Sequence, residues 1–495
     1  MDYNWDDMNA RNYTTVSRLA LVWKCLQESV LVCLFLGLLL GRAYAELPVD
    51  VSKSLRKFKI PDTSVSAMVV PLGSGEPLLS HRSNKPRNPA SVMKLVTTLV
   101  ALEILGPAHT WQTRFYINGT LKKGVLEGDL VIKGGGDPYL VQEQFWLQLA
   151  ALREMGIETI TGNLLIDNSA FDLPPHDRGE FDQQPTRLYN VGPSATVLNF
   201  NASRFRLHPK DGKVEVLLDP PIQNVVINNR LTLAEGSCRG ARGGWTVDVA
   251  QKKSKAYVVF NGRYKRKCGS YDLNRAVLDS EAYLYGVFAY LWRSLGGKFQ
   301  GGYANVEVKE DAEPIYTGES KPLAEVISGA NKYSNNLLAR QLLLAIGYHY
   351  FGDGTTVKDG VDAVQTWLRD KDLAMPELVM ENGAGLSRQI SLSAGSLNKL
   401  LVYAAHSAYH PEFMASFSLS GMDGTMKKRL EALNLGGRAR LKTGYVKGVR
   451  TLAGYLRADS GKDYAVVLFI TDSKVNFSNG NVIQDEFIKW ALKAG

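Results

Sequence analysis

Asn88-Pro89-Ala90-Ser91-Val92-Met93-Lys94 opens an apolar run that continues to Leu105, and this stretch decides the fold. The run is apolar on nearly every face, so we expect a buried helix that ends at Gly106-Pro107. Ser91 lies in its first turn, where free backbone N–H groups and the helix dipole favour developing negative charge. Lys94 lies on the same helix face. Lysine is rarely buried in an apolar helix, so its presence here indicates a specific role. The simpler alternative is an N-cap serine beside a lysine that reaches solvent.

Two later motifs, Ser334-Asn335-Asn336 and Lys442-Thr443-Gly444, follow in the order used by serine acyl-transfer sites whose base is a lysine. Each motif alone is weak, because Ser-x-x-Lys also occurs at Ser54–Lys57 and at Ser396–Lys399. The first of these decoys lies in a basic, solvated stretch and the second in a mixed amphipathic segment. Order and buried context therefore select the Ser-x-x-Lys of the apolar run.

In such a site the serine hydroxyl attacks an amide carbonyl, and water then hydrolyses the acyl-enzyme. The base must be neutral, and because an unperturbed lysine has a pKa near 10.4, its pKa must fall by about 3.4 to be half neutral at pH 7. Burial can lower it by about 3–5, and a second cation, Lys442, adds to the effect. We expect Ser334 to bridge protons between Lys94 and the leaving amine, and Asn336 to hold the substrate's peptide group through its side-chain amide.

The Lys-Thr-Gly stretch is expected on an edge strand beside Ser91, where Gly444 lets the substrate approach closely. Lys442 and Thr443 would hold a substrate carboxylate. The backbone N–H groups of Ser91 and Tyr445 would form the oxyanion hole, which typically contributes about 3–4 kcal/mol per donor.

The first 45 residues have the layout of a secretory signal peptide. Arg11, Arg18 and Lys24 precede the apolar stretch Ser29–Leu40, and Ala43-Tyr44-Ala45 fits a cleavage site. These 12 apolar residues are too few to span a bilayer comfortably, although an uncleaved anchor is the alternative. We therefore expect an exported protein whose mature chain begins at Glu46.

The net charge of +9 stays with the mature chain, because residues 1–45 hold four acids and four bases. Such a balance suits an anionic neighbour such as a cell wall or a membrane surface, and an exported chain is not expected to bind nucleic acid. The densest basic run lies between Lys252 and Lys267. A solvated face of strands and turns is the simpler interpretation of that run.

Two cysteines, Cys238 and Cys268, remain outside the expected signal peptide. An even pair in an oxidising compartment favours a disulfide. The bridge would close a loop of 31 residues and would stabilise the fold by roughly 3.5 kcal/mol in the chain-entropy model.

The chain between the first two motifs differs from its flanks. Residues 110–285 are rich in short β runs and turns, which indicates one or two inserted β-rich domains; residues 46–109 and 286–495 would form the catalytic domain. Strands are expected at 64–70, 451–456 and 464–470, and helices at 324–327, 336–345 and 484–493. No cofactor or metal is expected, since His406 and His410 could share a helix face but have no evident third ligand.

The three motifs, their order and the separation of 240 residues between Lys94 and Ser334 resemble the penicilloyl-serine transferases. More closely, the chain resembles the low-molecular-mass class C penicillin-binding proteins, the D-alanyl-D-alanine carboxypeptidase/endopeptidases, which carry two extra domains in this gap. The resemblance covers essentially all of residues 46–495. Other matching stretches are Lys133–Pro138, Tyr189–Ala195, Asn199–Asn201, Gly385–Arg388 and Gly421–Thr425.

This resemblance implies an α/β fold: a β-lactamase/transpeptidase-like penicillin-binding domain with an antiparallel sheet flanked by helices, plus inserted β-rich domains. It also implies a periplasmic serine hydrolase that acts on D-Ala-D-Ala termini and peptide cross-links of peptidoglycan, and that β-lactams acylate on Ser91. A β-lactamase or esterase would use the same residues, and a catalytically quiet wall-binding scaffold is a further alternative.

Two positions depart from the family pattern. Tyr445 follows Lys-Thr-Gly, where family members usually have Thr or Ser, so a hydroxyl donor to the substrate carboxylate is lost or displaced. Residues 382–386 read Asn-Gly-Ala-Gly-Leu, where a Ser-Gly-Leu pattern is common. Both departures could weaken turnover or shift substrate preference.

Overall fold

The computed structural model describes residues 46–495, apart from residues 74, 239 and 241–242. The expected signal peptide lies outside the described residues. Within the part that is described, none of the helices combines the length and the apolar character needed to cross a membrane.

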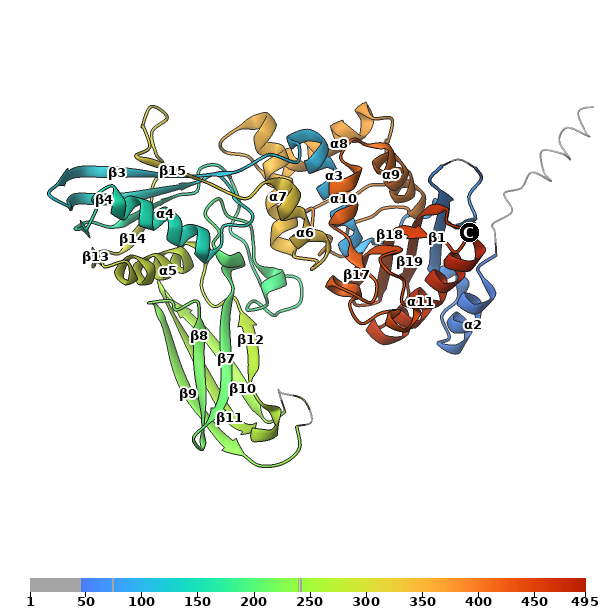
Figure 1. Ribbon diagram of the computed structural model, residues 1–495, viewed down its shortest axis with the longest axis horizontal. Helices are drawn as coiled ribbons and strands as arrows, with labels where there is room; N and C mark the ends of the chain where they lie inside the picture. Colours follow the sequence, from blue (N-terminus) through green and yellow to red (C-terminus); the bar gives the residue numbers. More distant parts are fainter. Residues whose placement is uncertain (1–45, 74, 239, 241–242) are drawn as a thin grey trace, which may run out of the picture. The chain divides into compact units, whose positions relative to one another are not determined.

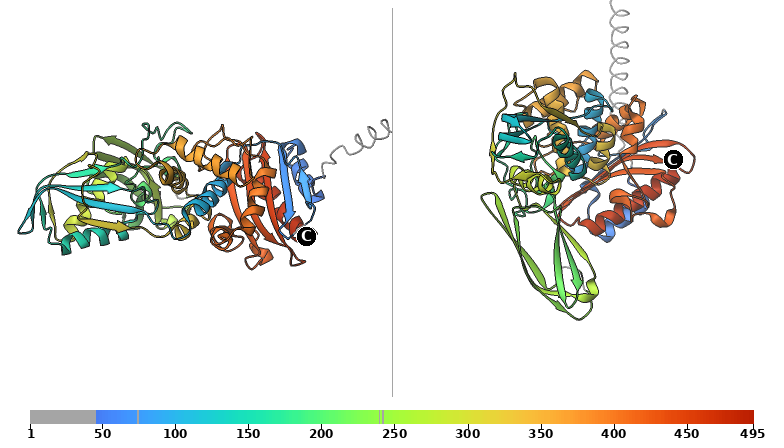
Figure 2. Two further views of the ribbon diagram at one scale, coloured as in Figure 1. Left: turned by 90° about the horizontal axis from the view of Figure 1, so that it is seen from above. Right: turned by 60° about the vertical axis from the view of Figure 1, so that its left-hand side comes forward.

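The catalytic domain is built on a six-stranded antiparallel sheet with the strand order β16-β17-β18-β19-β1-β2. Its strands are β1 (Val65–Pro71), β2 (Leu79–His81), β16 (Ser418–Leu419), β17 (Ala439–Val446), β18 (Val449–Arg457) and β19 (Asp463–Thr471). Strand β1 pairs with β19, so the two ends of the chain form one domain; the left view of Figure 2 shows the blue N-terminal strands alongside the red and orange C-terminal strands. The strands expected from the sequence at 64–70, 451–456 and 464–470 are confirmed.

Helices cover both faces of this sheet, and its central strands are therefore buried on both sides. Along β19, Val466 and Leu468 join the core shared with α2 (Val49–Lys57) and α11 (Phe477–Ala494). The alternate residues Val467 and Phe469 join the second core, which is shared with a helical layer. That layer contains α3 (Lys94–Leu105), α6 (Leu323–Asn331), α7 (Asn336–Phe351), α8 (Val357–Asp370), α9 (Ala394–His406) and α10 (His410–Ala415).

Helix α3 is the buried helix expected from the apolar run. Residues 94–102 are all buried, and the helix ends at Gly106, whose φ is 79°. The start differs from the expectation, because residues 90–93 form the short 3₁₀ turn η2 and the α-helix begins only at Lys94. Ser91 therefore lies in a tight turn that leads into the helix.

The insertion begins with a seven-stranded sheet in which β13-β5-β4-β3-β15 are consecutive neighbours and β6 pairs with β4 and β14. Its strands are β3 (Gln112–Lys122), β4 (Val125–Gly134), β5 (Thr159–Ile160), β6 (Leu164–Asp167), β13 (Lys298–Phe299), β14 (Tyr303–Asn305) and β15 (Tyr316–Glu319). Helices α4 (Gln142–Glu154) and α5 (Ser280–Ser294) share its core. The expected boundary at residue 285 falls inside α5, and β15 still pairs with β3. We therefore propose that the insertion ends near residue 320.

Residues 203–275 form a β-sandwich of two three-stranded sheets, drawn in green in Figure 1. One sheet has the order β12-β7-β8 and the other the order β10-β11-β9. The rings of Phe205 in β7 and Phe260 in β11 lie 5.5 Å apart in the core between the sheets. The strands are β7 (Ser203–Lys210), β8 (Lys213–Asp219), β9 (Val225–Ala234), β10 (Trp245–Lys252), β11 (Lys255–Lys265) and β12 (Tyr271–Arg275).

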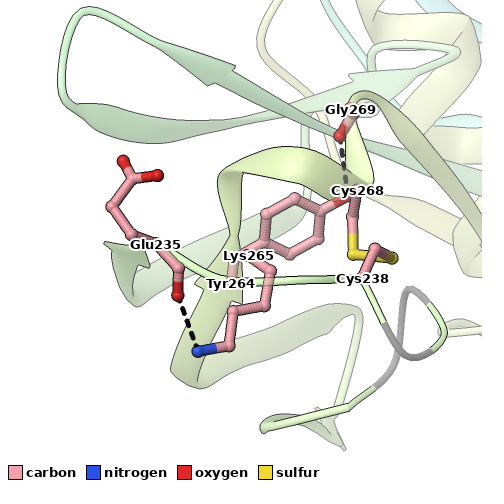
Figure 3. Close-up of a disulfide and its surroundings, with 6 residues drawn as sticks. All are labelled: Glu235, Cys238, Tyr264, Lys265, Cys268 and Gly269. Carbon is pink, nitrogen blue, oxygen red and sulfur yellow. Dashed lines mark hydrogen bonds between the residues drawn. A yellow bond between two sulfur atoms is a disulfide. The ribbon is translucent and has the colours of Figure 1, made fainter.

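Figure 3 shows the pairing expected from the sequence: Cys238 and Cys268 form a disulfide, with their Cα atoms 5.0 Å apart. Beside the bridge, the Tyr264 hydroxyl donates a hydrogen bond to the Gly269 carbonyl. The disulfide therefore ties the β9–β10 loop to the short turn that follows β11.

Candidate active site

The turn that carries Ser91 is held from two sides. Ala90 adopts a φ of 46°, and its N–H donates to the Asn88 side-chain oxygen at 2.8 Å. The same Asn88 side chain donates to the Ser387 carbonyl at 2.8 Å, while the Thr451 hydroxyl of β18 donates to the Pro89 carbonyl at 2.8 Å. A left-handed alanine costs free energy, so these contacts must fix the turn that presents Ser91.

Gly444 allows β17 to lie directly against this turn. A Cβ atom at Gly444 would lie 2.1 Å from the Thr451 hydroxyl and 2.9 Å from the Ser91 backbone nitrogen. Close approach of the nucleophile turn is therefore one reason for this glycine, and the expected close approach of the substrate stays a prediction. The expected edge position is confirmed from Lys442 onward, because β16 pairs only with Leu441 and Arg440.

Lys94 is 0% exposed and lies at the centre of the site. Its Nζ donates to the Asn336 side-chain oxygen at 2.7 Å and to the Ala384 carbonyl at 2.5 Å, and it lies 3.2 Å from the Ser91 hydroxyl. The two N–H groups of a neutral amine serve the first two contacts, which leaves the lone pair for the Ser91 hydroxyl. Burial holds the pKa of Lys94 well below its ordinary value, and the positive charges of Lys442 and Arg340 lower it further. None of these three partners is a carboxylate, so no negative charge in this set offsets the effect of burial.

Lys442 is also 0% exposed, and its Nζ donates to the Ser334 hydroxyl at 2.8 Å and to the Thr443 carbonyl at 2.8 Å. Burial lowers the pKa of Lys442 to about 7. Ser334, whose φ is 57°, thus hydrogen-bonds with Lys442. This differs from the expected contact with Lys94, because the three Lys94 bonds go to other acceptors.

Asn336 begins helix α7 and links Lys94 to the insertion. Its oxygen accepts from Lys94, and its amide nitrogen donates to the Tyr189 carbonyl at 3.0 Å. The amide that was expected to hold the substrate's peptide group is therefore already engaged. Thr443 is engaged as well, since its hydroxyl donates to the Thr425 hydroxyl at 2.9 Å.

Tyr445 extends to the first residue of α11. Its side chain is 44% exposed, and its ring meets the Phe477 ring edge-on at a centroid distance of 5.7 Å. The Arg450 guanidinium lies 5.6 Å from the Tyr445 centroid and 4.6 Å from that of Phe477. The Tyr445 ring, which departs from the family pattern, is thus stabilised by an aromatic ring on α11 and a cation on β18.

A cavity of about 260 Å³ adjoins the site and is lined by both the insertion and the catalytic domain. Arg340 and Asn382 connect it to the surroundings of Lys94. The other lining residues are His176, Asp177, Arg178, Glu180, Phe181, Asn190, Glu381, Leu386, Ser387, Arg388 and Gln389. A ligand longer than the reacting amide has room to extend here.

The sequence reasoning missed four contributors to the site: Arg340, Thr425 and the carbonyl groups of Ala384 and Tyr189. Tyr189 and Thr425 lie in stretches that match the family, and Ala384 lies in a stretch that departs from it. A main-chain carbonyl leaves no side-chain signal, so its role could be found only from coordinates. Among the described residues, no cluster of three or more His, Cys, Asp and Glu could hold a metal ion.

Comparisons with known proteins identify the family of this chain. The model of the D-Ala-D-Ala carboxypeptidase 3 (S13) family matches residues 47–493. The D-alanyl-D-alanine carboxypeptidase DacB of Haemophilus influenzae is 27% identical over 389 residues, which cover 77% of this chain and 80% of the relative. The D-alanyl-D-alanine carboxypeptidase of Actinomadura sp. is 26% identical over 438 residues, covering 85% and 80%.

The fold is also similar to solved structures. Penicillin binding protein 4 of Haemophilus influenzae matches with a TM-score of 0.75 at 24% identity, covering 90% of this chain and 100% of that chain. Its complex with a novel beta-lactam matches with a TM-score of 0.72 at 22% identity and the same coverage. These matches confirm the predicted fold: an antiparallel sheet flanked by helices, with added β-rich domains.

Proposed function

This chain belongs to the D-Ala-D-Ala carboxypeptidase 3 (S13) family, and we propose that Ser91 is its acylated nucleophile and Lys94 the base that activates it. The protein is a serine-type D-Ala-D-Ala carboxypeptidase that acts on peptidoglycan. One observation carries the residue assignment: the Nζ of a fully buried lysine, with no carboxylate among its bonded acceptors, lies 3.2 Å from the Ser91 hydroxyl. Burial of this kind favours the neutral amine, which can take a proton.

Acylation then moves two protons. The Ser91 oxygen attacks the carbonyl of the penultimate D-Ala while its proton passes to Lys94, and a proton from Lys442 passes through Ser334 to the leaving amine. The number of protons on the two lysines is unchanged, and free D-Ala leaves. The backbone N–H groups of Ser91 and Tyr445 are proposed to hold the oxyanion, and water later hydrolyses the ester.

Lys442 and Thr443 are proposed to attract the terminal carboxylate of the substrate, with the Thr443 hydroxyl exchanging its bond to Thr425. The same groups suit cross-linked peptidoglycan. In a cross-link the scissile amide joins the D-centre of a diamino acid, whose own carboxylate can take the terminal position. We therefore propose endopeptidase activity alongside carboxypeptidase activity, and covalent binding of β-lactams at Ser91. The expected signal peptide and the disulfide support a periplasmic location.

Labelling with a fluorescent penicillin tests the nucleophile. The wild-type chain should form a covalent adduct, and Ser91→Ala should form none, because it removes the hydroxyl that lies beside Lys94. Ser54→Ala, which removes a Ser-x-x-Lys serine on α2, should label like the wild type. Persistent labelling of Ser91→Ala would place the nucleophile elsewhere.

Product masses from purified muropeptide monomers and dimers test the reaction. Loss of one D-Ala from monomers reports carboxypeptidase activity, and splitting of dimers reports endopeptidase activity. Rapid release of hydrolysed penicillin, in place of a lasting adduct, would favour the β-lactamase alternative.

A further inference from the structure

The positive charge of the chain is concentrated in the β-sandwich of residues 203–275. This segment holds 15 of the 58 Lys and Arg residues but only 6 of the 49 Asp and Glu residues. The remaining 43 basic and 43 acidic residues cancel, so the whole excess of +9 belongs to 73 residues. An excess confined to one small body creates a local field that the average composition hides.

The two sheets of the sandwich differ in how they use their charges. On the β12-β7-β8 sheet three basic side chains are neutralised by ion pairs: Arg204 pairs with Asp219, Arg206 with Asp272 at 2.8 Å, and Lys210 with Glu215 at 3.6 Å. The outer face of the β10-β11-β9 sheet carries exposed basic residues that, among the described residues, form no ion pair. These are Arg230, Lys252, Lys255 and Arg263, and the same face carries one exposed carboxylate, Asp248.

The end of the sandwich that carries the disulfide extends this row of charges. Lys265 ends β11 and donates to the Glu235 carbonyl at 3.0 Å (Figure 3). Arg266 pairs with the Glu235 carboxylate at 2.9 Å. Lys267 is exposed beside Cys268. The disulfide therefore holds these cations at one end of the same sheet. We call Arg230, Lys252, Lys255, Arg263, Lys265 and Lys267 the cationic face.

The uncharged residues of this face are mainly polar. Exposed side chains between the cations are Asn228, Thr232, Thr246, Asn261 and Tyr257, and Val226 is its exposed large aliphatic residue. A bilayer-binding surface needs apolar side chains that enter the acyl boundary. Amides, hydroxyls and one aromatic ring instead suit a hydrated carbohydrate polymer with negative substituents.

We propose that the cationic face is a second, non-catalytic binding surface for the carboxylate-bearing, peptide-substituted glycan of the cell wall. This assignment rests on the proposed function for the identity of the polymer. The face holds the enzyme on an insoluble polyanion while the Ser91 site samples stem peptides. The binding is electrostatic and of low specificity, so it raises the local concentration of substrate without contacting the reacting atoms.

Co-sedimentation with purified sacculi tests the proposal, with Ser91→Ala as the parent chain so that the polymer stays intact. The parent should pellet with sacculi at about 50 mM salt and be released at about 0.5 M, since screening weakens exposed charges. Changing Arg230, Lys255, Arg263 and Lys267 to Gln together should lower the bound fraction on the order of tenfold. Sacculi whose carboxylates have been amidated should not retain the parent.

The opposite sheet supplies a matched control. Changing Arg204, Arg206, Lys210 and Lys213 to Gln removes the same number of charges from the same sandwich, and binding should stay within about twofold of the parent. Equal loss in both quadruple variants would reduce the effect to net charge and overturn the assignment of a face. Capture by vesicles of anionic phospholipid without capture by sacculi would also overturn it.

The same substitutions in a chain with Ser91 intact separate this proposal from the proposed function. Penicillin labelling and turnover of soluble muropeptides should be unchanged, while release of product from intact sacculi should fall. Absence of labelling in the wild type would refute the proposed function and leave the sedimentation result standing by itself. Unchanged sedimentation with normal labelling would refute the cationic face alone.

Discussion

The Ser91 cleft and the β-sandwich hold the same kind of side chain in opposite ways. In the cleft, Lys94 and Lys442 are both 0% exposed, and burial lowers the pKa of each. In the sandwich, lysines such as Lys255 and Lys267 are exposed to solvent. The comparison teaches that the environment decides whether a lysine acts as a base or as a long-range attractor.

The cleft stabilises these two buried amines with neutral oxygen atoms in place of carboxylates. An ammonium group deprived of water loses a large solvation free energy, and a buried acid would restore the charge and raise the pKa. Here neutral hydroxyl, amide and carbonyl oxygens surround both Nζ atoms. As a result, each of the two hydrogen-bonded amines can exchange a proton with the serine hydroxyl beside it.

Among the substitutions considered, replacement of Lys94 should have the largest effect on acylation. Lys94→Ala removes the base and should slow acylation by penicillin by about 10²–10⁴-fold. Lys94→Arg should be as slow, because arginine keeps its proton at any working pH. Stopped-flow acylation rates measure the effect, and circular dichroism checks the fold.

Lys255→Ala is the control from the sandwich and should acylate at the wild-type rate. A wild-type rate for Lys94→Arg would remove proton abstraction by this side chain from the mechanism.

Gly444→Ala should alter the geometry of the cleft while leaving both buried lysines in place. The new Cβ would lie 2.1 Å from the Thr451 hydroxyl and 2.9 Å from the Ser91 nitrogen, so β17 must separate from the nucleophile turn. We expect acylation to slow by about 10–100-fold, because small displacements of reacting groups are costly.

Gly302→Ala is the matched control for this strand shift, since its nearest neighbouring atom would be 3.6 Å away. Acylation of the control should stay at the wild-type rate. If both variants acylate normally, the contact between β17 and the turn does not set the geometry of attack.

The positions of the five principal side chains in one site could be predicted, because motif order and the buried context of Ser91 restrict the fold to one arrangement. The pairing within that site could not. Ser334 bonds to Lys442, and Lys94 bonds to the Ala384 carbonyl, because three chain segments meet there. Gly385 packs against the Ala90 carbonyl, and that approach places the neighbouring loop above Lys94. Contacts of this kind depend on tertiary packing and leave no local pattern.

The core of the catalytic domain was predictable for a different reason: β18, β19 and α3 are mainly apolar runs, long enough to be recognised as buried elements. The end of the insertion was not, because β13, β14 and β15 have two to four residues each. Strands this short carry too little alternation to be recognised. Their pairing with β3, β5 and β6 is set by the rest of the sheet.

The pH dependence of substrate binding should separate the two buried lysines. The pKa of Lys442 is lowered to about 7, so the group is charged below this pH and neutral above it. Affinity for a peptide ending in a free carboxylate should therefore weaken by about tenfold between pH 6 and pH 8, following the loss of the proton. Inhibition constants of D-Ala-D-Ala peptides over this range measure the change.

An amidated peptide supplies the comparison for this titration, because it presents no carboxylate and its affinity should stay nearly constant. Lys442→Gln should flatten the profile of the acid. Equal pH profiles for the acid and the amide would refute carboxylate recognition by Lys442.

Breaking the Cys238–Cys268 disulfide should have the smallest effect on the cleft and a clear effect on the sandwich. The bridge closes a loop of 31 residues, so replacing both cysteines with serine should destabilise the sandwich by roughly 3.5 kcal/mol in the chain-entropy model. Acylation at Ser91 should stay within about twofold, because the described hydrogen-bond partners of the Ser91 site all lie outside residues 203–275 and distant sites are usually independent. Intact mass after alkylation, with and without reduction, verifies the bridge, and thermal unfolding measures its effect. Since the cationic face is held in shape by this disulfide, the same variant should lose sacculus binding before it loses penicillin labelling; a parallel loss of both would show that the two regions unfold as one unit.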